Sequence, residues 1–372
     1  MAADTVLRVA LDVPLRTTFD YLPAEQEPPP LPGSRVVVPF GRRRAVGIVQ
    51  SVATSSELPA DKLRRIQTTL DSAPLLDQSI LDLCRWAATY YHHPIGEVIA
   101  TALPGQLRRG GSASPAGETA WRWCGPHETT VEAELHRAPR QKELAGLLLE
   151  HGPCTEPWLA RRLHNNWRAA LRALKGRGWV AAERVVDGFV GAARPAAHQL
   201  NPAQHEAAAA ITAALGEFAV FLLDGVTGSG KTEVYLQAAE AAIARGEQVL
   251  VLLPEISLTP QTSRRFRKRL GVPVVTLHSG LAEGERAGQW LLARDGTARV
   301  VIGTRSAAWT PLPDLGLIVV DEEHDPSLKQ QEGFRYSARD LVLLRAQRAD
   351  IPVVLGSATP SLDSLAQCAT GR

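Results

Sequence analysis

Residues 220–232 read Val-Phe-Leu-Leu-Asp-Gly-Val-Thr-Gly-Ser-Gly-Lys-Thr, and this stretch decides the fold. Its apolar start is typical of a buried β-strand, and the remainder fits the pattern G-x-x-x-x-G-K-[ST]. Glycines let the backbone N–H groups of such a loop wrap around a phosphate, and the helix that follows adds its dipole to the attraction. The stretch therefore predicts a strand, a phosphate-binding loop and a helix of an α/β domain.

The loop provides most of the predicted ATP-binding residues. We expect Lys231 to reach the β- and γ-phosphates and Thr232 to ligate Mg²⁺, so ATP and Mg²⁺ are the predicted cofactors. The backbone of the other loop positions should hold the phosphates: Gly225, Val226, Thr227, Gly228, Ser229 and Gly230.

A group of acidic residues follows the β-branched run at 317–320. In open α/β sheets ligands bind at the carboxyl ends of the strands, where Asp321 and Glu322 are expected. We assign Asp321 to Mg²⁺ and Glu322 to the general base that activates the attacking water. His324 either links the ATP site to a DNA site or is a structural histidine with satisfied hydrogen bonds.

Apolar runs alternate with amphipathic segments from residue 218 onward, which predicts a parallel sheet covered by helices on both faces. The expected strands are residues 220–223, 249–253, 274–277, 300–302, 317–320 and 353–355.

The segments around the loop indicate the class of nucleotide-binding protein. Gln204 precedes the first strand by about a turn and a helix, which suits contact with an adenine edge. Three further segments follow in the order of superfamily 2 helicases: L-P-E-I-S-L-T-P-Q (253–261), G-T-R-S (303–306) and G-S-A-T-P (356–360). We expect Thr304 and Arg305 to hold DNA phosphates. The residues expected to couple hydrolysis to strand movement are Ser357, Ala358 and Thr359.

Aromatic and basic residues alternate just after the carboxylates, at positions 329–340. Phe334, Arg335 and Tyr336 are predicted to contact DNA, with the rings stacking on a base. The alternative is that Phe334 and Tyr336 anchor the core. The basic residues at 264–269 either touch phosphates or form a solvated helix face.

The N-terminal part is predicted to hold two more domains. Residues 5–50 alternate apolar and polar positions, and a helical period follows at 80–88, which indicates a small β-rich domain over residues 1–105. Residues 106–190 contain a linker at 108–117, three short helices (139–150, 155–163 and 167–177) and a strand at 179–186. This order predicts a winged helix that binds DNA, and a helical spacer without DNA contact is the alternative. A linker at 188–197 leads into the motor lobe, for which we take residues 191–372.

Composition limits the other possibilities. The chain of 372 residues has 45% hydrophobic and 22% charged residues, and it has no apolar run long enough to span a bilayer. Its start lacks the features of a secretory signal, so we expect a cytoplasmic protein. The cysteines, Cys84, Cys124, Cys154 and Cys368, are too far apart for a zinc site. A net charge of +2 does not by itself indicate a nucleic-acid partner.

Taken together, these motifs resemble the family of primosomal protein N′, the PriA replication-restart helicases. The similar segments of the motor lobe are 224–235, 253–261, 277–281, 301–307, 321–325, 329–336 and 356–361. In the N-terminal domain the similar segments are P-L-R-T-T-F-D-Y-L (14–22), R-V-V-V-P-F-G (35–41) and Y-Y-H-H-P-I-G-E-V (90–98).

The resemblance implies a 3′-DNA-end-binding domain, a winged-helix domain and a RecA-like motor lobe that acts 3′ to 5′ at stalled forks. It implies that Phe19, Asp20 and Gly33 line a pocket for the terminal nucleotide, joined by Arg64 where the family commonly has lysine. Forked and single-stranded DNA, primosome proteins and single-strand-binding protein are the implied partners.

Two expectations concern what the chain lacks. The family's second motor lobe and its zinc-binding region are not in this sequence, so we expect a truncated form with slow hydrolysis, and we assign no zinc ligand. A DNA-fork-binding scaffold with little motor activity is the alternative function, and a translocase on double-stranded DNA is a third.

Overall fold

The computed structural model describes residues 5–25, 27–113, 118–126, 131, 134–151, 154–163, 166–185 and 200–370. The chain divides into two compact units. One unit comprises Met1–Pro115, His198–Phe266 and Val274–Arg372, and the other comprises Ala116–Ala197 and Arg267–Pro273. None of the helices in the described ranges has both the length and the apolar character that crossing a bilayer requires.

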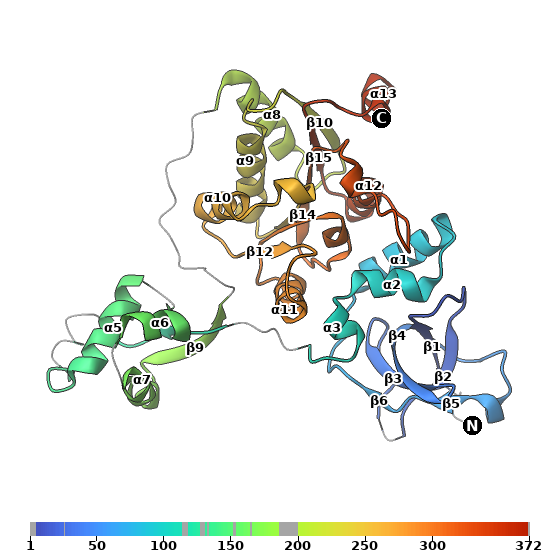
Figure 1. Ribbon diagram of the computed structural model, residues 1–372, viewed down its shortest axis with the longest axis horizontal. Helices are drawn as coiled ribbons and strands as arrows, with labels where there is room; N and C mark the ends of the chain where they lie inside the picture. The colour runs from blue at the N-terminus through green and yellow to red at the C-terminus, as the bar shows by residue number, and fades with distance from the viewer. Residues whose placement is uncertain are drawn as a thin grey trace. The chain divides into compact units, whose positions relative to one another are not determined.

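The N-terminal sheet of the first unit has the strand order β5-β2-β1-β4-β3-β6 (Figure 1). Its strands are β1 (Val6–Leu11), β2 (Phe19–Leu22), β3 (Arg35–Phe40), β4 (Arg43–Ala53), β5 (Arg64–Arg65) and β6 (Thr68–Thr69). Neighbouring strands pair antiparallel except β2 and β5, which run parallel. The alternation of apolar and polar positions places one set of side chains in a core that includes Leu7, Val9, Val36 and Val49.

Three helices and one short 3₁₀ turn accompany this sheet: η1 (Ala60–Lys62), α1 (Gln78–Tyr90), α2 (Ile95–Ala102) and α3 (Gly105–Arg108). Arg35 of β3 forms a buried ion pair, 2.7 Å long, with the carboxylate of Asp71 in the segment between β6 and α1. The same guanidinium donates to the carbonyl oxygens of Leu107 and Gly111. Removing either charge would leave the other one buried without its partner.

The motor lobe contains a six-stranded sheet in the order β10-β15-β14-β11-β13-β12. All of its neighbouring strands are parallel. They are β10 (Val220–Asp224), β11 (Gln248–Leu252), β12 (Val274–Leu277), β13 (Val300–Gly303), β14 (Leu315–Asp321) and β15 (Val353–Ser357). Each strand lies where the apolar runs predicted it, so the predicted parallel α/β architecture is confirmed.

Six helices and three 3₁₀ turns complete the lobe, and Figure 1 shows α9 and α12 on opposite sides of the sheet. The helices are α8 (Pro202–Ala213), α9 (Lys231–Ala244), α10 (Pro260–Leu270), α11 (Glu283–Arg294), α12 (Ala338–Ala349) and α13 (Leu362–Thr370). The turns are η2 (Glu255–Ser257), η3 (Arg305–Trp309) and η4 (Pro326–Leu328). Every residue of β11, β13 and β15 is buried, as expected for central strands covered on both faces.

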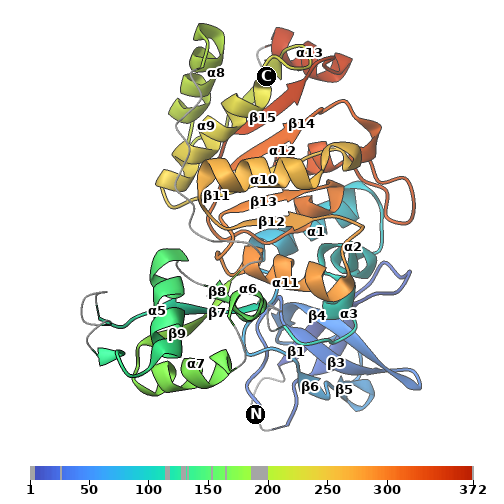
Figure 2. The same ribbon diagram turned by 60° about the vertical axis from the view of Figure 1, so that its left-hand side comes forward.

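Among its described residues, the second unit has three helices and a three-stranded antiparallel sheet of order β8-β7-β9 (Figure 2). Its elements are β7 (Glu118–Trp123), α5 (Pro139–His151), β8 (Cys154–Thr155), α6 (Glu156–Arg162), α7 (Trp167–Gly176) and β9 (Val180–Val185). The three predicted helices and the final strand are confirmed, but β7 and β8 were not predicted. The winged-helix assignment stays a prediction, and the expected linker at 188–197 falls outside the described residues.

Candidate nucleotide and DNA-end sites

The phosphate-binding loop lies between β10 and α9, with Gly228 and Gly230 in the left-handed region at φ 84° and 87°. Gly230 caps α9, which begins at Lys231. The positive φ of Gly230 favours glycine, and a Cβ there would also come within 2.4 Å of Nε2 of Gln204, whose side chain would have to shift. The two glycines thus produce the local geometry that turns backbone N–H groups toward an anion.

Lys231 joins the loop to the predicted carboxylates. Its Nζ donates to the carbonyl oxygen of Gly225 at 2.6 Å and lies 4.0 Å from Oε1 of Glu322. Its side chain is only 10% exposed. The structure therefore brings the loop and the carboxyl end of β14 together, as the sequence predicted.

Asp321 ends β14, and the hydroxyl of Tyr235 donates to its Oδ1 at 2.9 Å. Burial raises the pKa of Asp321 above its ordinary value, although the hydrogen bond from Tyr235 acts in the opposite direction. Burial also raises the pKa of Tyr235, so this phenol stays a hydrogen-bond donor. Sequence reasoning missed Tyr235, whose signal was its position four residues after Lys231 on the same helix face.

Thr232, Tyr235 and Asp321 line one cavity of about 230 Å³. The hydroxyl of Thr232 and the carboxylate of Asp321 are hard oxygen ligands of the kind that Mg²⁺ prefers. In the described part of the chain no group of three or more His, Cys, Asp or Glu residues could hold a metal alone. Such a partial ligand set fits Mg²⁺, because phosphates and water complete its coordination in nucleotide sites.

Glu322 has a left-handed backbone with φ 48°, which is uncommon for a residue other than glycine. Its carboxylate lies 4.0 Å from Nζ of Lys231 and 3.7 Å from Nδ1 of His324. Strained backbone of this kind is concentrated at functional sites, where the surrounding structure holds it in place.

His324 contacts both hydroxyl residues of the segment that was predicted to couple hydrolysis to movement. Its Nδ1 lies 2.7 Å from Oγ of Ser357, and its Nε2 lies 3.3 Å from Oγ1 of Thr359. These contacts fit both predicted alternatives, the polar link and a structural histidine with satisfied hydrogen bonds, and the intervening Ala358 lies on the same turn. The coupling role itself stays a prediction.

Glu323 forms a buried network that sequence reasoning did not anticipate. Its carboxylate accepts hydrogen bonds from the backbone N–H and the hydroxyl of Ser361, and from Arg339 at 2.8 Å. Burial alone would raise the pKa of Glu323, but these hydrogen bonds outweigh it and hold the pKa below its ordinary value. Glu323 therefore ties the end of β14 to the segment after β15.

Gln204 stands in a capping box at the start of α8, where its Oε1 accepts from the backbone N–H of Asn201. Its Nε2 donates to the carbonyl oxygen of Ser229 at 2.8 Å. The structure thus places Gln204 against the phosphate-binding loop, and its predicted contact with adenine stays a prediction.

Two of the predicted DNA-binding residues, Thr304 and Arg305, stand half-buried at the end of β13. The Arg305 guanidinium donates to the carbonyl oxygen of Ser327 at 3.2 Å, and its own carbonyl accepts from the hydroxyl of Tyr336 at 3.5 Å. Arg305 is therefore connected to the loop that follows the carboxylates.

The predicted stacking of Phe334 and Tyr336 on DNA does not agree with their burial, since they are only 6% and 4% exposed. The two rings stack with centroids 5.0 Å apart, and both pack against Trp309. Burial raises the pKa of Tyr336 to about 12. The alternative of core anchors therefore describes these rings, because neither presents a free face, whereas Arg335 between them is exposed.

The same aromatic cluster includes two residues of the N-terminal domain. Phe334 lies 5.8 Å from the ring of Tyr91 and 5.0 Å from the ring of His93. The hydroxyl of Tyr91 also accepts a hydrogen bond from the backbone N–H of Ser337, which caps α12. The loop after the carboxylates is thus held between the N-terminal helices and the motor lobe.

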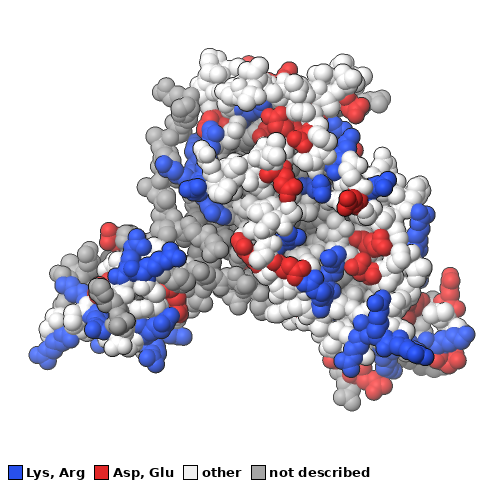
Figure 3. All heavy atoms as spheres, in the orientation of Figure 1, with Lys and Arg blue, Asp and Glu red and all other residues white. Residues whose placement is uncertain are grey.

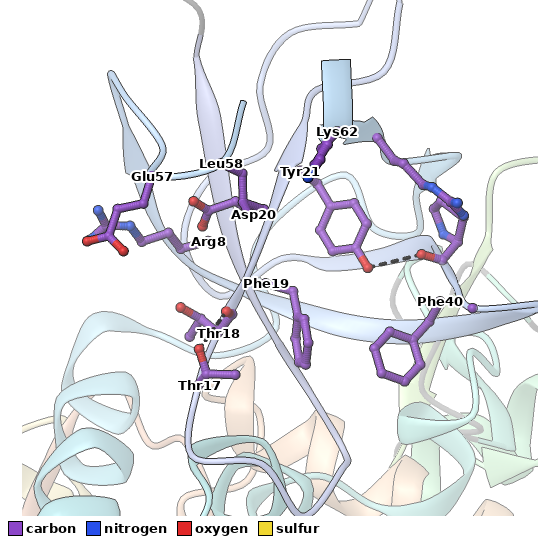
Figure 4. Close-up of a pocket in the computed structure, with 13 residues that line it drawn as sticks. Arg8, Thr17, Thr18, Phe19, Asp20, Tyr21, Phe40, Glu57, Leu58 and Lys62 are labelled. Atoms are coloured by element: carbon purple, nitrogen blue, oxygen red, sulfur yellow. Dashed lines mark hydrogen bonds between the residues drawn. The ribbon is translucent and has the colours of Figure 1, made fainter. Parts of the chain in front are cut away.

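A pocket of about 670 Å³ opens on the N-terminal sheet, and we call it the end pocket (Figure 4). Phe19, Asp20 and Arg64 line it, and the rings of Phe19 and Phe40 meet edge to face at 5.2 Å. The predicted role of these residues in holding a terminal nucleotide stays a prediction. Oγ of Ser56 donates to Asp20 at 2.5 Å. The other lining residues are Arg8, Thr17, Thr18, Tyr21, Pro39, Gly41, Glu57, Leu58 and Lys62.

Gly33 is not among these lining residues, so its predicted place in the end pocket is wrong. It has φ 89°, and a Cβ there would come within 1.9 Å of the carbonyl oxygen of Leu76. Gly33 is therefore a packing glycine under the segment that leads into α1. The glycine that does line the pocket is Gly41, which follows Phe40 at the β3–β4 turn.

Comparison with known proteins agrees with this arrangement. Residues 8–104 match the model of a 3′DNA-binding domain of PriA proteins, and residues 201–368 match that of DEAD/DEAH box helicases. Replication restart protein PriA of Haemophilus influenzae is 40% identical, with 99% of this chain and 51% of the relative covered. The corresponding proteins of Chlamydia pneumoniae and Bacillus subtilis are 32% and 30% identical, each over 91% of this chain and over 46% and 51% of their own length.

The chain thus spans about half the length of the curated relatives it matches. The first matched range contains the end pocket, and the second contains the nucleotide site. The chain therefore belongs to the PriA family of superfamily 2 DNA helicases and corresponds to the N-terminal region of its members.

Proposed function

We propose that this chain provides the DNA-end recognition and the first motor lobe of an ATP-dependent 3′-to-5′ helicase that restarts stalled replication forks. In this proposal the end pocket binds the 3′ end of a nascent strand, and the motor lobe binds Mg²⁺ and ATP. The observation that carries it is the convergence of Lys231, Thr232, Asp321 and Glu322 at one site.

The chemistry of the site suits phosphoryl transfer to water. Lys231 would exchange its contact with the carbonyl of Gly225 for the β- and γ-phosphates when ATP enters. Thr232 and Asp321 would hold Mg²⁺, which neutralises charge on the phosphates. Glu322 would accept the proton of the attacking water, and its position 4.0 Å from Lys231 supports this role.

His324 would couple the nucleotide-bound state to the segment at 357–359 through its contacts with Ser357 and Thr359.

The domain division into residues 1–105, 106–190 and 191–372 is part of the proposal, as are primosome proteins and single-strand-binding protein as partners. The scaffold alternative uses the end pocket without hydrolysis.

Two binding measurements on the chain test the proposal. A fluorescent ATP analogue should bind more tightly with Mg²⁺ than without it, and Lys231→Ala should weaken this binding strongly. Oligonucleotides that end in a 3′ hydroxyl should bind more tightly than the same strands blocked by a 3′ phosphate. If Lys231→Ala loses nucleotide affinity but still prefers 3′-hydroxyl ends, the two sites act independently. If the unmodified chain binds no nucleotide, the scaffold alternative is supported.

A further inference from the structure

The turn between β3 and β4 borders the end pocket and has three arginines in a row. Residues 41–44 read Gly-Arg-Arg-Arg, and Arg42, Arg43 and Arg44 are all exposed. Gly41 has φ 60°, and nothing lies within 4 Å of the position where its Cβ would stand. The turn therefore projects into solvent, and its first residue, Gly41, also lines the end pocket.

These three arginines have no acidic partner among the residues that the structure describes. Other arginines of the same sheet do: Arg35 pairs with Asp71 at 2.7 Å, and Arg65 pairs with Glu25 at 3.3 Å. Three uncompensated charges within one turn repel one another, which favours an anion beside them. Figure 3 shows basic side chains gathered over the strands of the N-terminal sheet.

The register of the hairpin connects the arginines to the pocket. Phe40 pairs with Arg43, and the Arg43 guanidinium carbon lies 5.9 Å from the centre of the Phe40 ring. Phe40 in turn meets Phe19 inside the end pocket. One surface thus runs from the aromatic floor of the pocket to the guanidinium groups of the turn.

We propose that Arg42, Arg43 and Arg44 bind the phosphates of the nucleotides that precede the 3′ terminus in the end pocket. This inference rests on the proposed function and adds a second, sequence-independent contact to it. Guanidinium groups bind phosphates through paired N–H donors, whatever the bases are. The pocket selects the end of the strand, and the turn supplies affinity that increases with strand length.

The test uses 3′-hydroxyl oligothymidylates of two to fifteen nucleotides, measured by fluorescence anisotropy over a range of salt concentrations. The variant replaces all three arginines by glutamine, and a matched variant replaces them by lysine, which keeps the charge. Asp20→Ala serves as the pocket variant. Circular dichroism of each variant checks that the sheet remains folded.

For the glutamine variant we expect about tenfold weaker binding of the longer strands near ~0.1 M salt, and a salt slope shallower by roughly 2 for three phosphates. Dinucleotide binding and the preference for a 3′ hydroxyl should persist, and the lysine variant should recover most of the affinity. A salt slope that is unchanged in the glutamine variant overturns the proposal. An equal loss of affinity for dinucleotides and for long strands also overturns it. If the unmodified chain shows no preference for 3′ ends, the proposed function itself fails.

Discussion

The nucleotide site and the end pocket are built in different ways. The nucleotide site is closed by its own hydrogen bonds: Lys231 to Gly225, Tyr235 to Asp321, and His324 to Ser357. The end pocket is an open surface. Its lining residues lie between Arg8 and Arg64 in the sequence, and few hydrogen bonds join their side chains. In the proposed function, the first site would be preorganised for a fixed ligand, and the second would rely on shape and charge to receive a flexible strand.

The largest effect should come from breaking the nucleotide site at Lys231→Ala. Loss of charge-assisted contacts to two phosphates, worth ~1.5–3 kcal/mol each, should weaken nucleotide binding about 100-fold or more. Titration of a fluorescent ATP analogue measures this. End recognition should be unchanged, and a parallel loss of the preference for 3′ ends would show that the sites are not independent.

Gly356→Ala should damage the nucleotide site through packing alone. A Cβ at this position would meet the hydroxyl of Tyr235 at 1.6 Å and its Cζ at 2.8 Å. Overpacking of this kind costs about 1–3 kcal/mol, so thermal denaturation should show a Tm several degrees lower. Adding Tyr235→Phe should restore part of the loss, because it removes the nearer of the two clashing atoms. A double variant no more stable than Gly356→Ala would contradict this account.

Phe19→Ala tests the end pocket. Loss of one ring from the aromatic floor should weaken binding of 3′-hydroxyl strands by about tenfold, in line with ~1–3 kcal/mol for base stacking. Nucleotide affinity should not change. Fluorescence anisotropy with strands that end in a 3′ hydroxyl or a 3′ phosphate measures both affinities. Equal weakening of the two would show that the Phe19 ring does not distinguish the ends.

Tyr235→Phe should produce a smaller change at the nucleotide site. It removes the hydrogen bond to Asp321 and leaves the ring, so the Mg²⁺ concentration needed for half-maximal nucleotide binding should shift about three- to tenfold. Nucleotide binding without Mg²⁺ should stay the same. A change that appears equally with and without the metal would show that Tyr235 acts on the fold and not on Asp321.

The smallest effects should be on stability, with opposite signs at Asp321 and Glu323. The pKa of Asp321 is raised, so its contribution to folding is present below its ordinary value of 3.8 and is lost as the pH rises through the folded value. The pKa of Glu323 is lowered, so its contribution is present above 4.5 and is lost as the pH falls through the folded value.

Asp321→Asn should therefore raise Tm slightly at pH 7, and Glu323→Gln should lower it. The Asp321 difference should shrink as the pH falls through its raised folded pKa toward 3.8, and the Glu323 difference should shrink as the pH falls below 4.5 toward its lowered folded pKa. Thermal denaturation between pH 4 and pH 8 measures them. A lower Tm for Asp321→Asn across this range would mean that its burial is not a cost to the folded chain.

The sequence predicted the nucleotide site well because its residues form short contiguous motifs attached to strand ends. The glycine-rich loop and the acidic group after a β-branched run each determine their local backbone conformation. The parallel strands then bring both to the same edge of the sheet. The predicted strands of the motor lobe all formed, because central strands are apolar at nearly every position.

The end pocket and the aromatic loop were harder to predict. Gly33 and Gly41 both follow proline-containing segments, and only the fold shows which one reaches the pocket. Phe334 and Tyr336 flank the charged Arg335 as in an exposed strand, but Tyr91 and His93, more than 240 residues earlier, pack against Phe334. Contacts this distant in sequence leave no local pattern.

The most direct test of the central claim is the Mg²⁺ dependence of nucleotide binding in Asp321→Asn. If the phosphate-binding loop and the end of β14 share one Mg²⁺-nucleotide, this variant should bind the ATP analogue without metal as the unmodified chain does. It should also lose the increase in affinity that Mg²⁺ gives. Full retention of that Mg²⁺-dependent increase would contradict the claim that Asp321 and the loop hold the same ion.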